Sequence, residues 1–124
     1  MKQGPEYEIL FYETADGYCP VDDYLDELSI KVRAKIEKWM EQLEIYGPDL
    51  PRPYADSLRD KIRELRIKFS GSQYRLLYFF SNKKIVMTHG ILKKTEQVPE
   101  EEIDKAVRMM KDYETRLKRG EIEL

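Results

Sequence analysis

The sequence predicts one α+β domain, with an N-terminal strand, a helix or helical hairpin, a three-stranded antiparallel meander and a C-terminal helix. Three observations predict this fold class: helical spacing of apolar residues in two segments, strict alternation of apolar and charged residues in a third, and three β-rich runs separated by short turns. Because domains cluster around roughly 100–150 residues, we expect residues 1–124 to form a single domain with its own core.

The first elements are a strand and a helix. Residues 7–13 (YEILFYE) are rich in aromatic and β-branched types and precede the turn-forming ADG at 15–17. Pro20 suits a first helical turn, and Asp22 and Asp23 complement its dipole. Apolar residues then recur at helical spacing: Val21, Leu25, Leu28, Val32, Ile36, Trp39, Met40 and Leu43. Ser29 is a good N-cap, so either one helix or a hairpin of two is expected before Gly47 and Pro48 end the element.

The meander follows a proline-rich segment. Residues 47–57 (GPDLPRPYADS) show no periodicity and are predicted to be a connecting loop. Residues 62–69 alternate, with Leu65, Ile67 and Phe69 on a core face and Glu64, Arg66 and Lys68 on a charged, outward face. Residues 73–80 and 84–93 are the next two strands, joined by the tight turns SGS and SNK. Gly90 indicates a bulge or the close approach of another backbone.

The last element is a helix. Pro99 is expected at its first position, and three glutamates follow in the first turn. The apolar positions are Ile103, Ala106, Val107, Met110, Tyr113 and Leu117. Lys118, Arg119 and Gly120 form a favourable C-terminal end.

Charge is unevenly distributed, although the net charge is only −2. Residues 1–57 contain six Lys or Arg against thirteen Asp or Glu, whereas residues 58–94 contain ten against two. A concentrated positive surface most often meets phosphate, while the alternative is that it pairs with the acidic helices.

Several function classes are disfavoured by composition. Cys19 and His89 are each the single residue of their type, so we expect no disulfide, no metal site and no cofactor, and His89 is interpreted as a packed strand residue. No apolar run is long enough for a membrane helix and no signal peptide is visible, so we expect a cytoplasmic protein without a membrane partner.

The basic strands suggest a phosphodiester site. If the strands pair in order, Arg66 and Lys68 share a face, Arg75 lies across the turn, and Lys93 and Lys94 close the far end. Such a solvent-open hollow suits a phosphodiester and the charge that develops on it during substitution. RNA supplies its own nucleophile, the 2′-hydroxyl, and the candidates for proton transfer are Lys93, Lys94, Tyr74 and His89.

The sequence segments that contain these residues resemble those of a known protein family. The segments LRDKIRELRIKFSGSQYRLLYFF, IVMTHGILKKT and VPEEEIDKAVRMMKDY, in this order, resemble the RelE superfamily of toxin–antitoxin ribonucleases, in particular its HigB-like, phage-derived branch. The resemblance covers about residues 58–113. Its combined motifs are ELR at 64–66, YR at 74–75, HG followed by two lysines and a threonine, and the Pro-acid-Ile-Ala helix start.

The resemblance implies a RelE-like fold and a metal-independent endoribonuclease, an mRNA interferase that cleaves mRNA in the ribosomal A site. It implies a cognate antitoxin, of helix-turn-helix DNA-binding type, as partner. Transferred residue by residue, it makes Arg66, Arg75, Lys93 and Lys94 catalytic and Arg63, Lys68 and Tyr74 RNA-binding.

Two positions depart from the family pattern. Ile91 replaces the aromatic residue that usually follows HG, and Val98 replaces a threonine N-cap. Two other interpretations stay open: a noncatalytic RNA- or protein-binding regulator with the same fold, and a basic face that mainly docks an acidic antitoxin.

Overall fold

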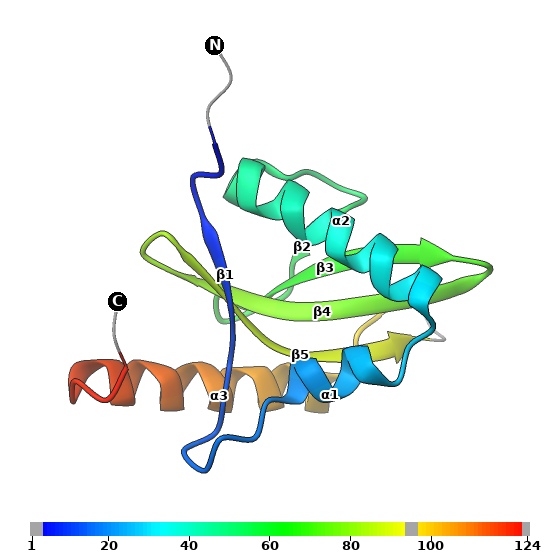
Figure 1. The fold of residues 1–124 in the computed structure, drawn as a ribbon. Helices are drawn as coiled ribbons and strands as arrows, with labels where there is room; N and C mark the ends of the chain where they lie inside the picture. The colour runs from blue at the N-terminus through cyan, green and yellow to red at the C-terminus, as the bar shows by residue number, and fades with distance from the viewer. Residues whose placement is uncertain (1–3, 94–96, 123–124) are drawn as a thin grey trace.

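The computed structural model describes residues 4–93 and 97–122, which form a five-stranded mixed sheet with helices on both faces (Figure 1). The strands are β1 Glu8–Phe11, β2 Ala55–Ser57, β3 Arg63–Phe69, β4 Ser72–Ser81 and β5 Lys84–Lys93. The helices are α1 Pro20–Asp26, α2 Ile30–Tyr46, the short 3-10 helix η1 Gly47–Asp49, and α3 Glu100–Lys118. The predicted α+β class is therefore confirmed.

The sheet is wider than the predicted meander. Its order is β1-β5-β4-β3-β2, in which β1 runs parallel to β5 and the other neighbours are antiparallel. The meander is confirmed as β3-β4-β5. The prediction that residues 47–57 are only a loop is wrong, because they contain η1 and the edge strand β2. A three-residue strand beside prolines is too short to show a period of two, and only its pairing with β3 defines it.

The β3–β4 hairpin turns within the predicted SGS segment, but the turn is one residue shorter than expected, because Ser72 already belongs to β4. Ser70 and Gly71 both have positive φ, 51° and 79°, as type I′ hairpin turns require. This two-residue turn sets the register of the hairpin, in which Arg66 lies directly opposite Arg75.

The helices begin and end at recognisable caps. The Ser29 hydroxyl accepts a hydrogen bond from the Val32 amide (3.3 Å), so the hairpin alternative is the one observed and α1 and α2 are separate helices. The expectation for α3 is wrong by one position: Pro99 is its N-cap rather than its first helical residue. Val98 is consequently not the cap and lies buried in the core instead.

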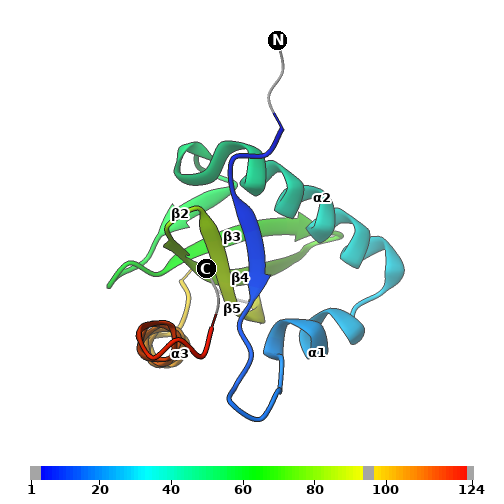
Figure 2. The same ribbon diagram turned by 60° about the vertical axis from the view of Figure 1, so that its left-hand side comes forward.

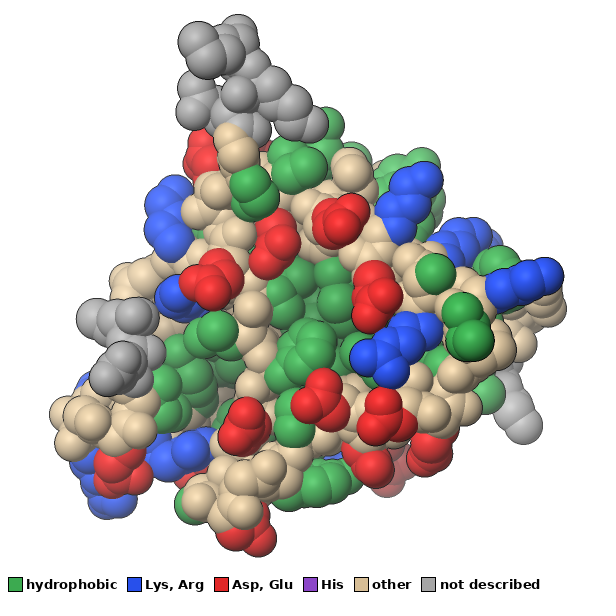
Figure 3. Space-filling view, in the orientation of Figure 1, with side chains coloured by type: hydrophobic (Ala, Val, Ile, Leu, Met, Phe, Trp, Pro, Cys, Tyr) green, Lys and Arg blue, Asp and Glu red, His purple; other side chains and the backbone are tan. Residues whose placement is uncertain are grey.

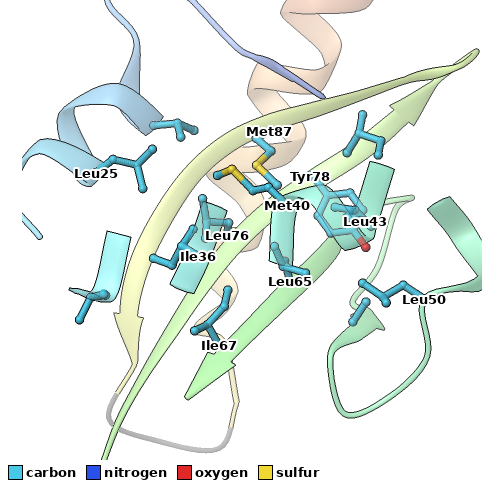
Figure 4. Packing of buried hydrophobic residues seen from close by; sticks show 14 residues of the cluster. Leu25, Ile36, Met40, Leu43, Leu50, Leu65, Ile67, Leu76, Tyr78 and Met87 are labelled. Carbon is cyan, nitrogen blue, oxygen red and sulfur yellow. The ribbon is translucent and has the colours of Figure 1, made fainter. Parts of the chain in front are cut away.

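Both faces of the sheet are covered, with α1 and α2 on one face and α3 on the other (Figures 1 and 2). The sheet divides the core into two clusters. The α2-side cluster includes Leu65 and Leu76 of the sheet, packed with residues such as Ile36 (Figure 4). The α3-side cluster includes Leu77 and Ile103. The second face of residues 62–69 is charged, as expected, but only part of it is open: Glu64 is buried, Arg66 is half-buried and Lys68 is exposed.

Gly90 of β5 lies against α1. A Cβ atom at Gly90 would lie 2.4 Å from the ring of Tyr24, whose hydroxyl donates to the Ile91 carbonyl (3.1 Å). The close approach expected at Gly90 is real, but a side chain makes it rather than a backbone. The irregularity in the β4–β5 ladder lies elsewhere, between Leu77 and Tyr78.

Candidate nucleic-acid interface

Strand pairing brings the predicted cationic positions to one end of the sheet. Arg66 pairs with Arg75, and Lys68 pairs with Gln73, whose other neighbour is Lys93. Residues two apart on a strand share a face, so Arg66, Lys68 and Arg75 all belong to the face that α3 partly covers. The predicted register, with Arg66 and Lys68 on one face and Arg75 across the turn, is confirmed.

Arg75 is not open to solvent. Its side chain is 0% exposed; Nε donates to Glu64 Oε1 (2.8 Å) and Nη2 to Gln73 Oε1 (2.7 Å). Glu64 is itself only 6% exposed. The expectation that Arg75 stands in a solvent-open hollow is therefore wrong, because its side chain is buried and pairs with its diagonal neighbour Glu64.

Arg66 and Lys68 are more exposed than Arg75. Arg66 is half-buried and Lys68 is exposed, and within residues 4–93 and 97–122 neither side chain makes a hydrogen bond or an ion pair. By contrast, the Arg59 guanidinium bonds to Asp104, Glu100 and Asp60, which raise its pKa. The charge of Arg66 helps to lower the pKa of nearby Asp56, but the two side chains form no ion pair, so the guanidinium can still bond to an external phosphate.

An aromatic pair lies beside these two cations. The rings of Trp39 and Tyr54 stack with centroids 4.4 Å apart and an interplanar angle of 17°, and Tyr54 is 40% exposed. With Lys35, Arg66 and Lys68 they line a cavity of about 220 Å³. Exposed aromatic faces next to cations suit an unpaired nucleobase.

Neither residue of this aromatic pair is marked as a site residue by the sequence pattern. Trp39 has the spacing of a core residue in α2, and Tyr54 lies in the segment predicted to be a loop. No local pattern relates residues fifteen positions apart in different elements, so only the tertiary structure reveals the stack.

Arg63 and Tyr74 lie on the other face of the sheet. Arg63 pairs with Tyr78 of the α2-side cluster, donates from Nη1 to Ser57 Oγ (3.1 Å) and lies near the Phe80 ring. Tyr74 packs against the same cluster. Both residues thus lie across the sheet from Arg66, and neither lines the cavity that Arg66 shares with Trp39 and Tyr54.

The lysine pair is described only in part. Lys93 is the last residue of β5 and its backbone pairs with Gln73, but its side chain is outside the described part of the structure. Lys94 lies entirely outside the described residues.

His89 is the packed strand residue that the sequence predicts. It is 3% exposed, with Nε2 2.9 Å from Glu102 Oε1 and Nδ1 3.0 Å from the Thr88 hydroxyl. Burial lowers its pKa below the ordinary 6.5 despite the Glu102 hydrogen bond, so the imidazole is neutral and its Nε2–H donates to Glu102, while the Thr88 hydroxyl donates to the Leu77 carbonyl (3.2 Å). His89 is thus shielded from the cationic surface by α3.

Two absences hold for residues 4–93 and 97–122. They contain no group of three or more His, Cys, Asp or Glu placed to hold a metal ion. They also contain no helix that is long and apolar enough to cross a membrane.

The sequence was compared with known proteins. No curated protein matches it. The family model described as "Phage derived protein Gp49-like (DUF891)" matches residues 23–111, which include α2, the whole meander and therefore Arg66, Lys68 and the Trp39–Tyr54 pair. The chain belongs to this Gp49-like family of phage-derived proteins, within the RelE/ParE-like toxin superfamily.

Proposed function

We propose that this protein is a HigB-like toxin of a type II toxin–antitoxin system, which cleaves mRNA in the ribosomal A site and is held inactive by a cognate helix-turn-helix antitoxin. Family membership supports this proposal, since Gp49-like proteins are associated with RelE-type toxin ribonucleases. The main structural support is the group formed by Arg66, Lys68 and the Trp39–Tyr54 stack, which combines unpaired cations with an exposed aromatic face.

The proposed reaction needs positioned charge. The 2′-oxygen attacks the adjacent phosphorus, the bond to the 5′-oxygen breaks, and a 2′,3′-cyclic phosphate and a 5′-hydroxyl result. The Arg66 guanidinium contacts two phosphate oxygens and Lys68 contacts the backbone, so both stabilise the charge of the pentavalent transition state. Tyr54 stacks on a splayed base and holds the linkage in line.

Proton transfer remains assigned to Lys93 and Lys94. One lysine removes the 2′-hydroxyl proton and the other protonates the leaving 5′-oxygen. Of the other two candidates, Tyr74 lies across the sheet from Arg66 and His89 is buried beneath α3.

We assign Arg75 a positioning role. Because its guanidinium ties Glu64 of β3 to β4, it fixes the hairpin that presents Arg66 and Lys68. Arg75→Ala leaves the Glu64 carboxylate buried without its partner, which costs about 3–5 kcal/mol, so lost activity in that variant reports unfolding as well as chemistry.

Arg66→Ala is the cleaner test. On induced expression in bacteria, the wild-type protein is expected to arrest growth and to produce mRNA ends at the A site. Arg66→Ala is expected to abolish both while retaining the wild-type circular dichroism spectrum. The matched control is Arg108→Ala, an exposed arginine on α3 outside the cavity, which is expected to arrest growth like the wild type. Undiminished arrest and cleavage by a folded Arg66→Ala variant would refute the assigned role.

The burial of Arg75 favours one alternative, a noncatalytic RNA- or protein-binding regulator, because it removes a cation from the surface. Purified protein added to ribosomes carrying a defined mRNA separates the two. Binding that weakens with salt but leaves the mRNA intact supports the regulator, whereas A-site cleavage supports the toxin.

A further inference from the structure

The outer edge of β1 is open from the Ile9 carbonyl to Phe11, whereas before it the amides of Tyr7 (3.1 Å) and Ile9 donate to Glu44 of α2. β1 has only one neighbour in the sheet, β5, and the amides of Glu8 and Tyr12 donate to β5 or the turn before it. In a parallel ladder alternate residues turn toward the neighbour, so the backbone groups of Ile9 and Phe11 point away from β5. The Ile9 amide donates to Glu44 Oε2 (2.8 Å). Within residues 4–93 and 97–122, no hydrogen bond reaches the Ile9 carbonyl or either backbone group of Phe11.

This edge lies in an apolar hollow. A cavity of about 740 Å³ is lined by residues 9–12 of β1, by Met40 of α2 and by Tyr113 of α3, and is named here the β1 groove. Figure 3 shows the hollow as an apolar surface on the face where β1 lies, surrounded by acidic side chains. The groove therefore offers apolar contacts on both sides of an open strand edge.

The rim of the β1 groove is acidic. The lining includes five carboxylate residues, Glu13, Asp22, Glu41, Glu44 and Glu121. Its one cation, Arg116, is bonded to the Asp112 carboxylate (2.9 Å) and to the Glu13 carbonyl. The local field thus favours positive groups.

We propose that the β1 groove binds an extended, basic segment of a partner protein, which adds a sixth strand to the sheet along β1. Backbone hydrogen bonds to Ile9 and Phe11 hold the segment, its alternate apolar side chains enter the hollow, and its Lys or Arg side chains meet the rim. A second copy of this chain is a poor occupant, since two acidic grooves repel each other.

The docking surface does not depend on the proposed ribonuclease activity. β1 and the β2–β3 side form opposite edges of the sheet, so a segment on β1 leaves Arg66 and Lys68 uncovered. Peptide binding in the β1 groove and RNA cleavage at Arg66 and Lys68 can therefore be tested independently.

The test uses a nine-residue peptide of alternating lysine and valine with blocked ends, titrated into the full chain by calorimetry. Binding is expected to weaken as salt rises and to fall at least tenfold when glutamate replaces every lysine. In an added strand, every second backbone amide faces β1. Two peptides are therefore compared, one N-methylated at the odd-numbered residues and one at the even-numbered residues, and one of the two is expected to lose binding. Equal binding of the lysine and glutamate peptides would overturn the proposal.

Two readouts on the protein locate the peptide. The Phe11 amide is expected to exchange its hydrogen at least tenfold more slowly with peptide bound. Cys19 lines the groove, so a bound peptide is expected to slow alkylation of its thiol as well; burial raises the pKa of this thiol, so the reaction is followed at alkaline pH. Unchanged Phe11 exchange at saturating peptide excludes the β1 edge. Protection of Phe11 without peptide, with a dimer in sedimentation, would instead make a second copy the occupant and refute the basic segment.

A charge-reversal pair supplies the control. Glu41→Lys, on the rim, is expected to lower the affinity of the lysine–valine peptide at least fivefold. Glu114 is an exposed α3 residue outside the groove, and Glu114→Lys is expected to leave the peptide affinity unchanged. Equal effects of the two variants would show that net charge, rather than the groove, attracts the peptide.

Discussion

At the scale of single residues, the neighbours of an arginine decide its role. Arg63, Arg66 and Arg75 lie on the same hairpin and have the same side-chain chemistry. Arg63 contacts Ser57 and Phe80, Arg75 is enclosed with Glu64, and Arg66 makes no such pairing within the described chain. Of these three arginines, only Arg66 is available to a phosphate. The hairpin therefore offers fewer phosphate-binding arginines than its sequence contains.

His89 predicts a pH dependence of stability. Its folded pKa is lowered by burial, so as the pH falls below 6.5 the unfolded chain gains a proton at His89 while the folded chain keeps the residue neutral. The free energy of unfolding is therefore expected to fall with pH in this range, by at most about 1.4 kcal/mol per pH unit from this group.

Urea unfolding between pH 7 and 5.5 measures this dependence. His89 is the only histidine, so a folded His89→Asn variant is expected to show a flatter profile than the wild type. Parallel profiles would show that His89 does not stay neutral on folding.

At the scale of elements, α1 packs closely on β5 because Gly90 of β5 has no side chain. The Tyr24 ring occupies the space of a Cβ at Gly90, and its hydroxyl bonds to the next residue of β5. Burial raises the pKa of this hydroxyl, which therefore remains protonated as a donor. The glycine is needed for packing, because its backbone φ is not in the left-handed region.

Gly90→Ala is expected to lower the free energy of unfolding by about 1–3 kcal/mol, because the new methyl group and the Tyr24 ring cannot occupy the same space. Thermal or urea unfolding measures the loss. Tyr24→Leu in the same chain should recover part of it, whereas Gly4→Ala, where no atom lies within 4 Å, should have no effect. A full loss that Tyr24→Leu does not reduce would point to backbone strain instead of the ring.

At the scale of the whole molecule, opposite edges of the sheet carry opposite charge. The β1 groove is rimmed by carboxylates, whereas the cavity beside β3 is lined by Lys35, Arg66, Lys68 and Arg75. The linear charge segregation of the sequence thus becomes a spatial one, with the acidic N-terminal part forming β1 and its surroundings. Each edge favours a different class of partner.

This arrangement predicts the salt dependence of RNA binding. The logarithm of the affinity for a single-stranded oligonucleotide should fall linearly with the logarithm of the salt concentration, and Arg66→Ala should lower the slope by about 0.7, the value of one phosphate contact. Glu41→Gln, at the far edge, should leave the slope unchanged. Fluorescence anisotropy at several salt concentrations measures both, and an Arg66→Ala slope equal to that of the wild type would exclude a phosphate contact.

The sequence by itself determined several local elements of this protein: the turn within SGS, the alternation in β3 and the apolar stripe of α3. Each depends on residues a few positions apart, and such neighbours interact in any fold that contains the element. The exact register of the hairpin was not among them: the SGS segment predicts a turn, but only the structure shows that Ser72 belongs to β4 and that Arg66 pairs with Arg75. The sequence also left open whether one helix or two surround Ser29.

Only the tertiary structure decided which side chains meet solvent. The burial of Arg75 depends on its pairing with Glu64 of the neighbouring strand. The Trp39–Tyr54 stack and the pairing of β1 with β5 join segments that are distant in sequence. Long-range packing decides how deeply a side chain is buried and which residue it pairs with. The periodicity of one segment cannot predict which other segment will pack on it.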